Sequence, residues 1–135
     1  TAAVDFLAAL APHGGSRRER LVAANTLIHH HELVLRERIE DGLRGFGDAL
    51  TLHSLAAERT PTLFFSFTSQ DADAASRFLA DRDILAPAGS FYAYEPFRAL
   101  NLSVDSGMRV GLAPYNDQGD VDRLLEGLAD FLRHA

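Results

Sequence analysis

The hydrophobic positions in the first third of the chain recur at helical spacing. Residues 2–10 form one short helical segment, and Ser16 and Glu19 then have the spacing of a capping box that starts a second helix. An apolar stripe follows, formed by Leu21, Ala24, Ile28, Leu35 and Ile39. The stripe predicts a helix that runs to about Gly42 or Gly45. Its length of about seven turns suits a spine between domains better than a core helix.

The pattern changes from residue 49 onward. A β-branched and aromatic run follows Pro61, which favours the first position of a strand. Asp117 precedes an apolar stripe at helical spacing and is expected to cap the closing helix. The segments expected are strands over 49–53, 62–68, 84–86 and 108–113, helices over 71–81 and 117–133, an aromatic loop over 89–95, and one helical turn over 96–100.

This order of elements predicts an α+β fold. We expect a two-layer sandwich with a short sheet of three to four strands and helices mainly on one face, preceded by the long connecting helix. The candidate boundary lies at Gly42–Asp48, where the long helix ends. It divides the chain into residues 1–47 and residues 48–135.

Composition excludes several classes of function. The 135 residues, 47% of them hydrophobic, are enough for an ordinary core. A net charge of -6 and the absence of a basic run argue against nucleic-acid binding, and no apolar run is long enough to cross a membrane. The chain has no cysteine, which excludes disulfides and a thiol nucleophile and fits a cytoplasmic location. All 13 basic residues are arginines, so chemistry at a lysine needs another chain or segment.

Two features are candidates for chemistry. Arg109 stands on an apolar strand, where burial without an anionic partner would be costly. Its partner is either a structural carboxylate or the carboxylate of a ligand held by two hydrogen bonds. The loop Gly89, Ser90, Phe91 and Tyr92 is rich in aromatic residues, whereas loops are normally polar. Its rings either fold back onto the core or line a pocket.

The remaining polar clusters have structural explanations. His29, His30 and His31 are consecutive on a helix, so they point about 100° apart and do not chelate one ion. The paired aspartates stand at helix ends, where capping explains them. No metal site and no catalytic residue are expected in this chain.

Four motifs carry a family resemblance. They are Arg59-Thr60-Pro61-Thr62, Gly89-Ser90-Phe91-Tyr92-Ala93, Arg109-Val110-Gly111-Leu112, and Tyr115-Asn116 with Asp120-Val121-Asp122-Arg123-Leu124-Leu125 after it. In this order and spacing the chain resembles the C-terminal small domain of class V aminotransferases, pyridoxal-phosphate enzymes of fold type I. The subgroup that it resembles is the cysteine desulfurase-like proteins.

The resemblance implies a role for Arg109 and a larger parent protein. Arg109 matches the family arginine that binds the α-carboxylate of an amino-acid substrate, and the loop at Gly89 closes over the cofactor. Tyr92 stands where true desulfurases have their catalytic cysteine. Residues 1–47 correspond to the end of a large domain plus the connecting helix, and residues 48–135 to the small domain. The Schiff-base lysine belongs to the missing large pyridoxal-phosphate-binding domain.

Three functions are therefore open. The first is the small domain of a pyridoxal-phosphate-dependent transferase or lyase, a fragment that is not catalytic alone and whose parent is a homodimer. The second is a non-enzymatic α+β module that binds a small anion or has a regulatory role. The third is a plain interaction domain in which Arg109 is paired internally.

Overall fold

The computed structural model describes residues 1–135 apart from residues 13, 100–105 and 135. The helices are α1 (Ala2–Ala9), α2 (Arg17–Gly45), the 3-10 turn η1 (Gly47–Ala49), α3 (Ala72–Ala80), α4 (Tyr94–Ala99) and α5 (Gln118–His134). The strands are β1 (Leu50–Leu52), β2 (Thr62–Phe67), β3 (Ala88–Gly89) and β4 (Gly107–Gly111).

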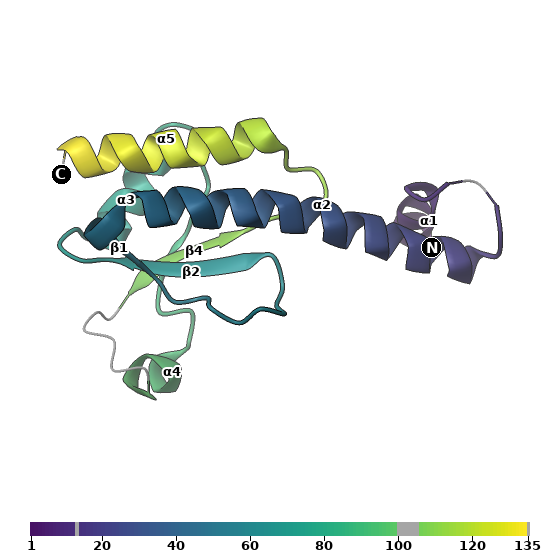
Figure 1. Ribbon diagram of the computed structural model, residues 1–135, viewed down its shortest axis with the longest axis horizontal. Coiled ribbons are helices and arrows are strands. Elements are labelled where there is room, and N and C mark those ends of the chain that lie inside the picture. The colour runs from purple at the N-terminus through teal and green to yellow at the C-terminus, as the bar shows by residue number, and fades with distance from the viewer. Residues whose placement is uncertain (13, 100–105, 135) are drawn as a thin grey trace.

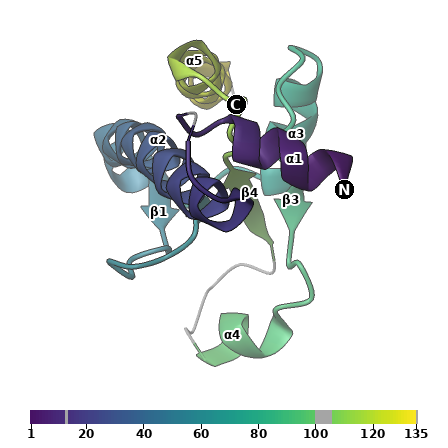
Figure 2. The same ribbon diagram turned by 90° about the vertical axis from the view of Figure 1, so that its right-hand side faces the viewer.

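The four strands form one antiparallel sheet in the order β1-β2-β4-β3. Helices α2, α3 and α5 lie together on one side of this sheet, and α4 lies on the other side (Figures 1 and 2). The expected α+β sandwich with helices mainly on one face is confirmed.

The core lies between the sheet and the three helices. Strand β2 alternates, so Leu63 and Phe65 are completely buried against the helices while Phe64 between them faces the other way. Met108 of β4 and Leu128 of α5 complete the centre, and both are completely buried. The alternation of the strand therefore turns one of its faces toward the apolar faces of the covering helices.

Helix α2 begins where its sequence predicts. The Ser16 side chain accepts a hydrogen bond from the Glu19 backbone N–H, and the Glu19 carboxylate accepts one from the Ser16 backbone N–H, so the capping box is confirmed. Only the C-terminal half of α2 packs on the core, through Leu35, Ile39 and Leu43. Its N-terminal half extends beyond the sheet and carries α1 (Figure 1). None of the described helices is both long enough and apolar enough to cross a membrane.

The strand expected over residues 84–86 is wrong. Residues 84–86 are not a strand: the Ile84 N–H bonds to the Leu79 carbonyl and the Ala86 carbonyl accepts from the Ser76 hydroxyl, so both ends are bound to α3. The sheet edge comes later, at Ala88 and Gly89, and Gly89 was expected to begin the loop. Local sequence cannot show this shift, because the hydrogen-bond partner of the edge is β4.

Candidate functional site

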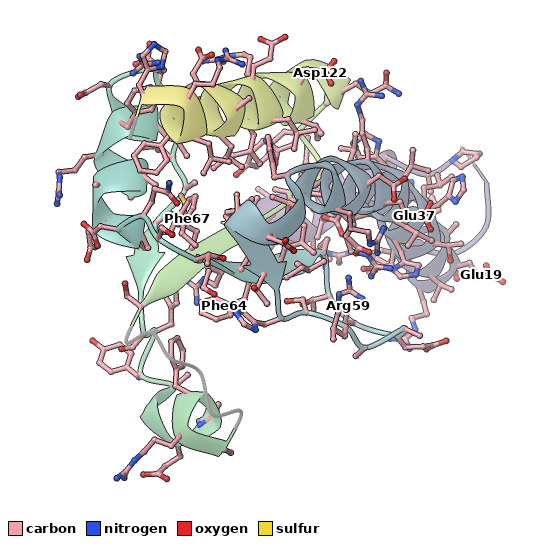
Figure 3. All side chains as sticks on the ribbon, turned by 60° about the vertical axis from the view of Figure 1, so that its left-hand side comes forward. Glu19, Glu37, Arg59, Phe64, Phe67 and Asp122 are labelled. Carbon is pink, nitrogen blue, oxygen red and sulfur yellow. The ribbon has the colours of Figure 1, made fainter. Side chains whose placement is uncertain are left out.

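The side of the sheet that faces away from α2, α3 and α5 carries the candidate site. We call it the open face. It presents alternate residues of β2, among them Phe64 and Ser66, together with Arg109 of β4. Figure 3 shows Phe64 and Phe67 on opposite sides of β2, with Phe64 toward the open face. The site is thus built on strands whose other face is fixed by the core.

Arg109 is exposed, not buried. Its neighbours Met108 and Val110 point into the core, so the alternation of β4 turns Arg109 to the open face, opposite Phe64 of β2. Arg109 forms no ion pair with a carboxylate among the described residues. The premise that a charge on this apolar strand would be buried is therefore wrong, since water reaches the guanidinium.

The partner of Arg109 is an aromatic ring. The Cζ atom of Arg109 lies 4.1 Å from the centre of the Phe91 ring, the geometry of a cation–π contact. Phe91 also meets Phe64 edge to face, at 6.4 Å between ring centres. The structure thus brings together Arg109 and one residue of the predicted loop, and the ring orients the guanidinium without neutralising it.

The rest of the loop is arranged differently. Phe91 and Tyr92 have φ angles of 53° and 62°, which are unusual for residues other than glycine, after Gly89 at 148°. The Tyr92 side chain is 99% exposed, pointing into solvent rather than toward the core. The Ser90 carbonyl accepts a hydrogen bond from the Ala93 N–H, which closes the turn. The backbone therefore separates the two aromatic residues, so that one covers Arg109 and the other is free.

The structure adds residues that the sequence did not single out. The ring of Phe64 lies 5.2 Å from that of Phe97 in α4 and 5.5 Å from that of His53, just after β1. Alternation along 62–67 is a signal that Phe64 and Ser66 share a face. No signal in the sequence brings His53 and Phe97 to the same ring, because this depends on the register and order of the strands.

His53 is held by a hydroxyl on the open face. Its Nε2 lies 2.8 Å from the Oγ of Ser66, which is a buried residue. Burial lowers the pKa of His53 below its usual value of 6.5, because the charged ring loses solvation. His53 is therefore a neutral imidazole at pH 7.

A second cluster of charges lies on α2 and has a structural role. Glu40 is only 8% exposed and receives Arg36 at 3.2 Å, Arg44 at 3.0 Å and Arg59. Arg59 also donates to the Ala56 carbonyl. This network joins the β1–β2 connection to α2, and it accounts for Arg59 without a ligand. The helical pattern of the sequence did not indicate that Arg36 and Glu40 are buried.

The turn before α5 is also explained by its own hydrogen bonds. Asn116 Oδ1 accepts from the Ala113 N–H, Asn116 Nδ2 donates to Asp120, and the Asp117 side chain accepts from the Asp120 N–H. The Asn116 amide and the Asp117 backbone N–H both donate to the Asp120 carboxylate and lower its pKa. The predicted cap at Asp117 is confirmed. A cavity of about 350 Å³ adjoins this turn, and Arg109 is not among its lining residues.

The histidine run of α2 is solvent-facing. His29, His30 and His31 are exposed, and His31 Nε2 lies 2.8 Å from the Asn116 carbonyl oxygen. Within the part of the chain that the structure describes, no three histidine or acidic side chains are grouped to hold a metal ion.

Solved structures share this fold over most of the chain. The cysteine desulfurase CsdA (S-sulfonic acid) from Escherichia coli is 24% identical with a TM-score of 0.69, over 78% of this chain and 25% of that chain. The cysteine desulfurase from Thermococcus onnurineus NA1 is 16% identical with a TM-score of 0.77, over 88% and 29%. A NifS-like protein from Rickettsia africae ESF-5 is 16% identical with a TM-score of 0.72, over 87% and 33%.

These structures are several times longer than the present chain, which spans a quarter to a third of their lengths. No curated protein matches the sequence. The family model for aminotransferase class-V matches residues 23–124, about three quarters of the chain, including β1 to β4 and the start of α5. The chain therefore belongs to the aminotransferase class-V family.

Proposed function

We propose that this chain is the small C-terminal domain of a pyridoxal-phosphate-dependent class V enzyme, in which Arg109 binds the α-carboxylate of an amino-acid substrate. The observation that supports this most is the guanidinium of Arg109. It lies on the open face, stacks on Phe91 and forms no ion pair with the described carboxylates. An arginine fork with free donors fits a carboxylate with two parallel hydrogen bonds.

The residues present fit the substrate side of such a site. The chain has no lysine, so the lysine that binds the cofactor must come from the large domain. When bound, pyridoxal phosphate supplies the electron sink for bond breaking at the substrate. This chain supplies the charge that holds the substrate, and in this proposal residues 1–47 connect it to the large domain of a homodimeric transferase or lyase.

The loop contributes to binding in a defined way. The Phe91 ring covers one face of the Arg109 guanidinium, so it keeps water from that face and fixes the plane in which the donors lie. Gly89, Ser90 and Tyr92 would complete the active-site loop, and the exposed Tyr92 ring is free to contact the cofactor or substrate. With no cysteine in the chain, this loop has no thiol to receive sulfur from a substrate.

Substitution of Arg109 in the complete protein tests the proposal. In Arg109→Ala, the amino-acid concentration for half-maximal change of the cofactor absorbance is expected to rise about 10- to 100-fold, because a charge-assisted pair is lost. Arg109→Lys should recover part of the affinity. The control is Arg77→Ala, which replaces an exposed arginine of α3 and should leave the half-saturating concentration unchanged. An unaltered half-saturation in Arg109→Ala would remove Arg109 from the site.

The coding sequence upstream of Thr1 gives an independent test. We expect it to encode a large domain with a lysine-bearing loop. A reading frame that begins near Thr1 would contradict the enzyme and favour an anion-binding module.

A further inference from the structure

We propose that His53 is a second ligand contact on the open face, where it binds a hydrogen-bonding group at the far end of the substrate side chain. The inference rests on the proposed role of Arg109 and adds a substrate class to it. The substrate is an amino acid whose side chain is a short apolar stem that ends in an amide or a hydroxyl group.

The first support is the position of His53 in the sheet. The His53 N–H bonds to the Phe64 carbonyl at 2.9 Å, which continues the β1–β2 ladder by one residue. Phe64 in turn stands opposite Arg109 of β4. His53, Phe64 and Arg109 therefore form one row across three strands of the open face. Because neighbouring strands are about 4.8 Å apart, the Cα atoms of His53 and Arg109 are about 10 Å apart.

The second support is that His53 is held in place while one of its ring nitrogens has no hydrogen-bond partner among the described residues. Nε2 is bound to the Ser66 hydroxyl, and the ring lies 5.5 Å from the Phe64 ring. Nδ1 makes no hydrogen bond with the described residues. An imidazole has two hydrogen-bonding nitrogens, so one remains for a ligand, as a donor or an acceptor according to the tautomer that Ser66 selects. Because the ring is neutral at pH 7, it recognises a hydrogen-bonding group rather than a charge.

The third support is the apolar surface between the two polar ends. A Cβ atom on Gly107 would lie 2.5 Å from the Cζ of Phe64, so the Phe64 ring occupies the space that a side chain at 107 would need. The Phe64 ring therefore leans over β4, next to Arg109, and provides apolar surface between His53 and the Phe91 and Phe97 rings that pack against it. The probe for this row is a ligand that carries a carboxylate and a polar group about 5 Å apart, across four bonds of the usual C–C length.

A matched pair of ligands tests the inference on the 135-residue chain. The probes are glutaramate, which is glutamine without its amino group, and pentanoate, which has the apolar stem alone. We follow the Arg109 Nε–H and His53 ring signals by NMR during each titration. Both ligands should shift the Arg109 signal, and only glutaramate should shift His53. Glutaramate should bind about 5-fold more tightly, the equivalent of one hydrogen bond.

Variants locate the origin of the preference. His53→Phe keeps the ring volume and should make the two ligands bind equally, without weakening pentanoate. Ser66→Ala removes the hydroxyl that holds the imidazole and should reduce the preference for glutaramate over pentanoate. This second variant tests the inference if His53→Phe does not fold. His30→Gln, an exposed histidine of α2, is the control and should keep the 5-fold difference.

The outcomes separate this inference from the proposed function. If both ligands shift Arg109 equally and neither shifts His53, the His53 contact is overturned while the carboxylate role of Arg109 stands. If neither ligand shifts either signal, the His53 contact is overturned as well. The role of Arg109 then depends on the half-saturation measurement in the complete protein.

Discussion

The two faces of the sheet use the same strands for different purposes. On the helix side, Leu63, Phe65 and Met108 are completely buried and belong to the apolar core cluster. On the open face, Phe64 and Arg109 alternate with these residues and remain accessible. The core face explains why the chain folds, and it would accept many apolar combinations of the right volume. The open face carries groups that packing does not require, so it is where function is to be sought.

Truncation of neighbouring phenylalanines should give the largest contrast between the faces. Phe65→Ala removes a completely buried ring and should lower the free energy of unfolding by about 3–5 kcal/mol. Phe64→Ala should cost only about 1–2 kcal/mol, because half-burial leaves part of the ring in water already. Urea denaturation of the two variants measures both values. Equal losses would show that the open face is also part of the core.

Glycine substitutions in β4 should give a smaller effect that reports on the position of the Phe64 ring. A Cβ at Gly107 would approach Phe64 Cζ to 2.5 Å and the Phe65 carbonyl oxygen to 2.7 Å, so Gly107→Ala should lower the free energy of unfolding by about 1–3 kcal/mol. Gly111→Ala is the matched control, with its nearest atom at 3.7 Å, and should change stability by less than about 0.5 kcal/mol. Thermal denaturation that ranks the two variants in reverse would place the Phe64 ring elsewhere.

The pH dependence of stability between pH 7.5 and pH 5 should give the smallest effect, and in that range we assign it to His53 on the open face. Burial lowers the pKa of His53 below 6.5, so the unfolded chain binds more protons than the folded chain between that lowered pKa and 6.5. The contribution of His53 is complete above pH 6.5 and is lost as the pH falls through that window. The urea midpoint should therefore fall more between pH 7.5 and pH 5 for the wild type than for His53→Phe.

The control for this measurement is His30→Gln, which should follow the wild-type dependence. A His53→Phe chain with the same loss of stability on acidification as wild type would contradict the assignment to His53.

Much of the fold could be predicted because its signals are local. The Ser16–Glu19 capping box, the entry into β2 after Pro61 and the cap at Asp117 each depend on residues within four positions of one another. The misplaced strand shows the limit of such signals. Residues 84–86 are apolar and short enough for a strand, but their hydrogen bonds go to α3, and the pairing with β4 begins at Ala88.

The candidate site was predictable in part. Arg109 and the loop at Gly89 could be named from the sequence, and the structure places Phe91 against Arg109. The sequence did not indicate that Tyr92 points away from its neighbour, since this follows from two successive left-handed residues. It also gave no reason to connect His53 with Ser66, because residues 13 positions apart meet only through strand pairing.

The sequence by itself determined the long capped helix, the α+β class, the absence of lysine and cysteine chemistry, and the motifs that indicate the family. These depend on composition and on contacts between near neighbours in the chain. Only the tertiary structure decided that Arg109 is exposed and stacked rather than buried and paired, and that His53, Phe64 and Arg109 lie in one row. The strand order β1-β2-β4-β3 creates that row, and strand order is set by the packing of the whole sheet against its helices.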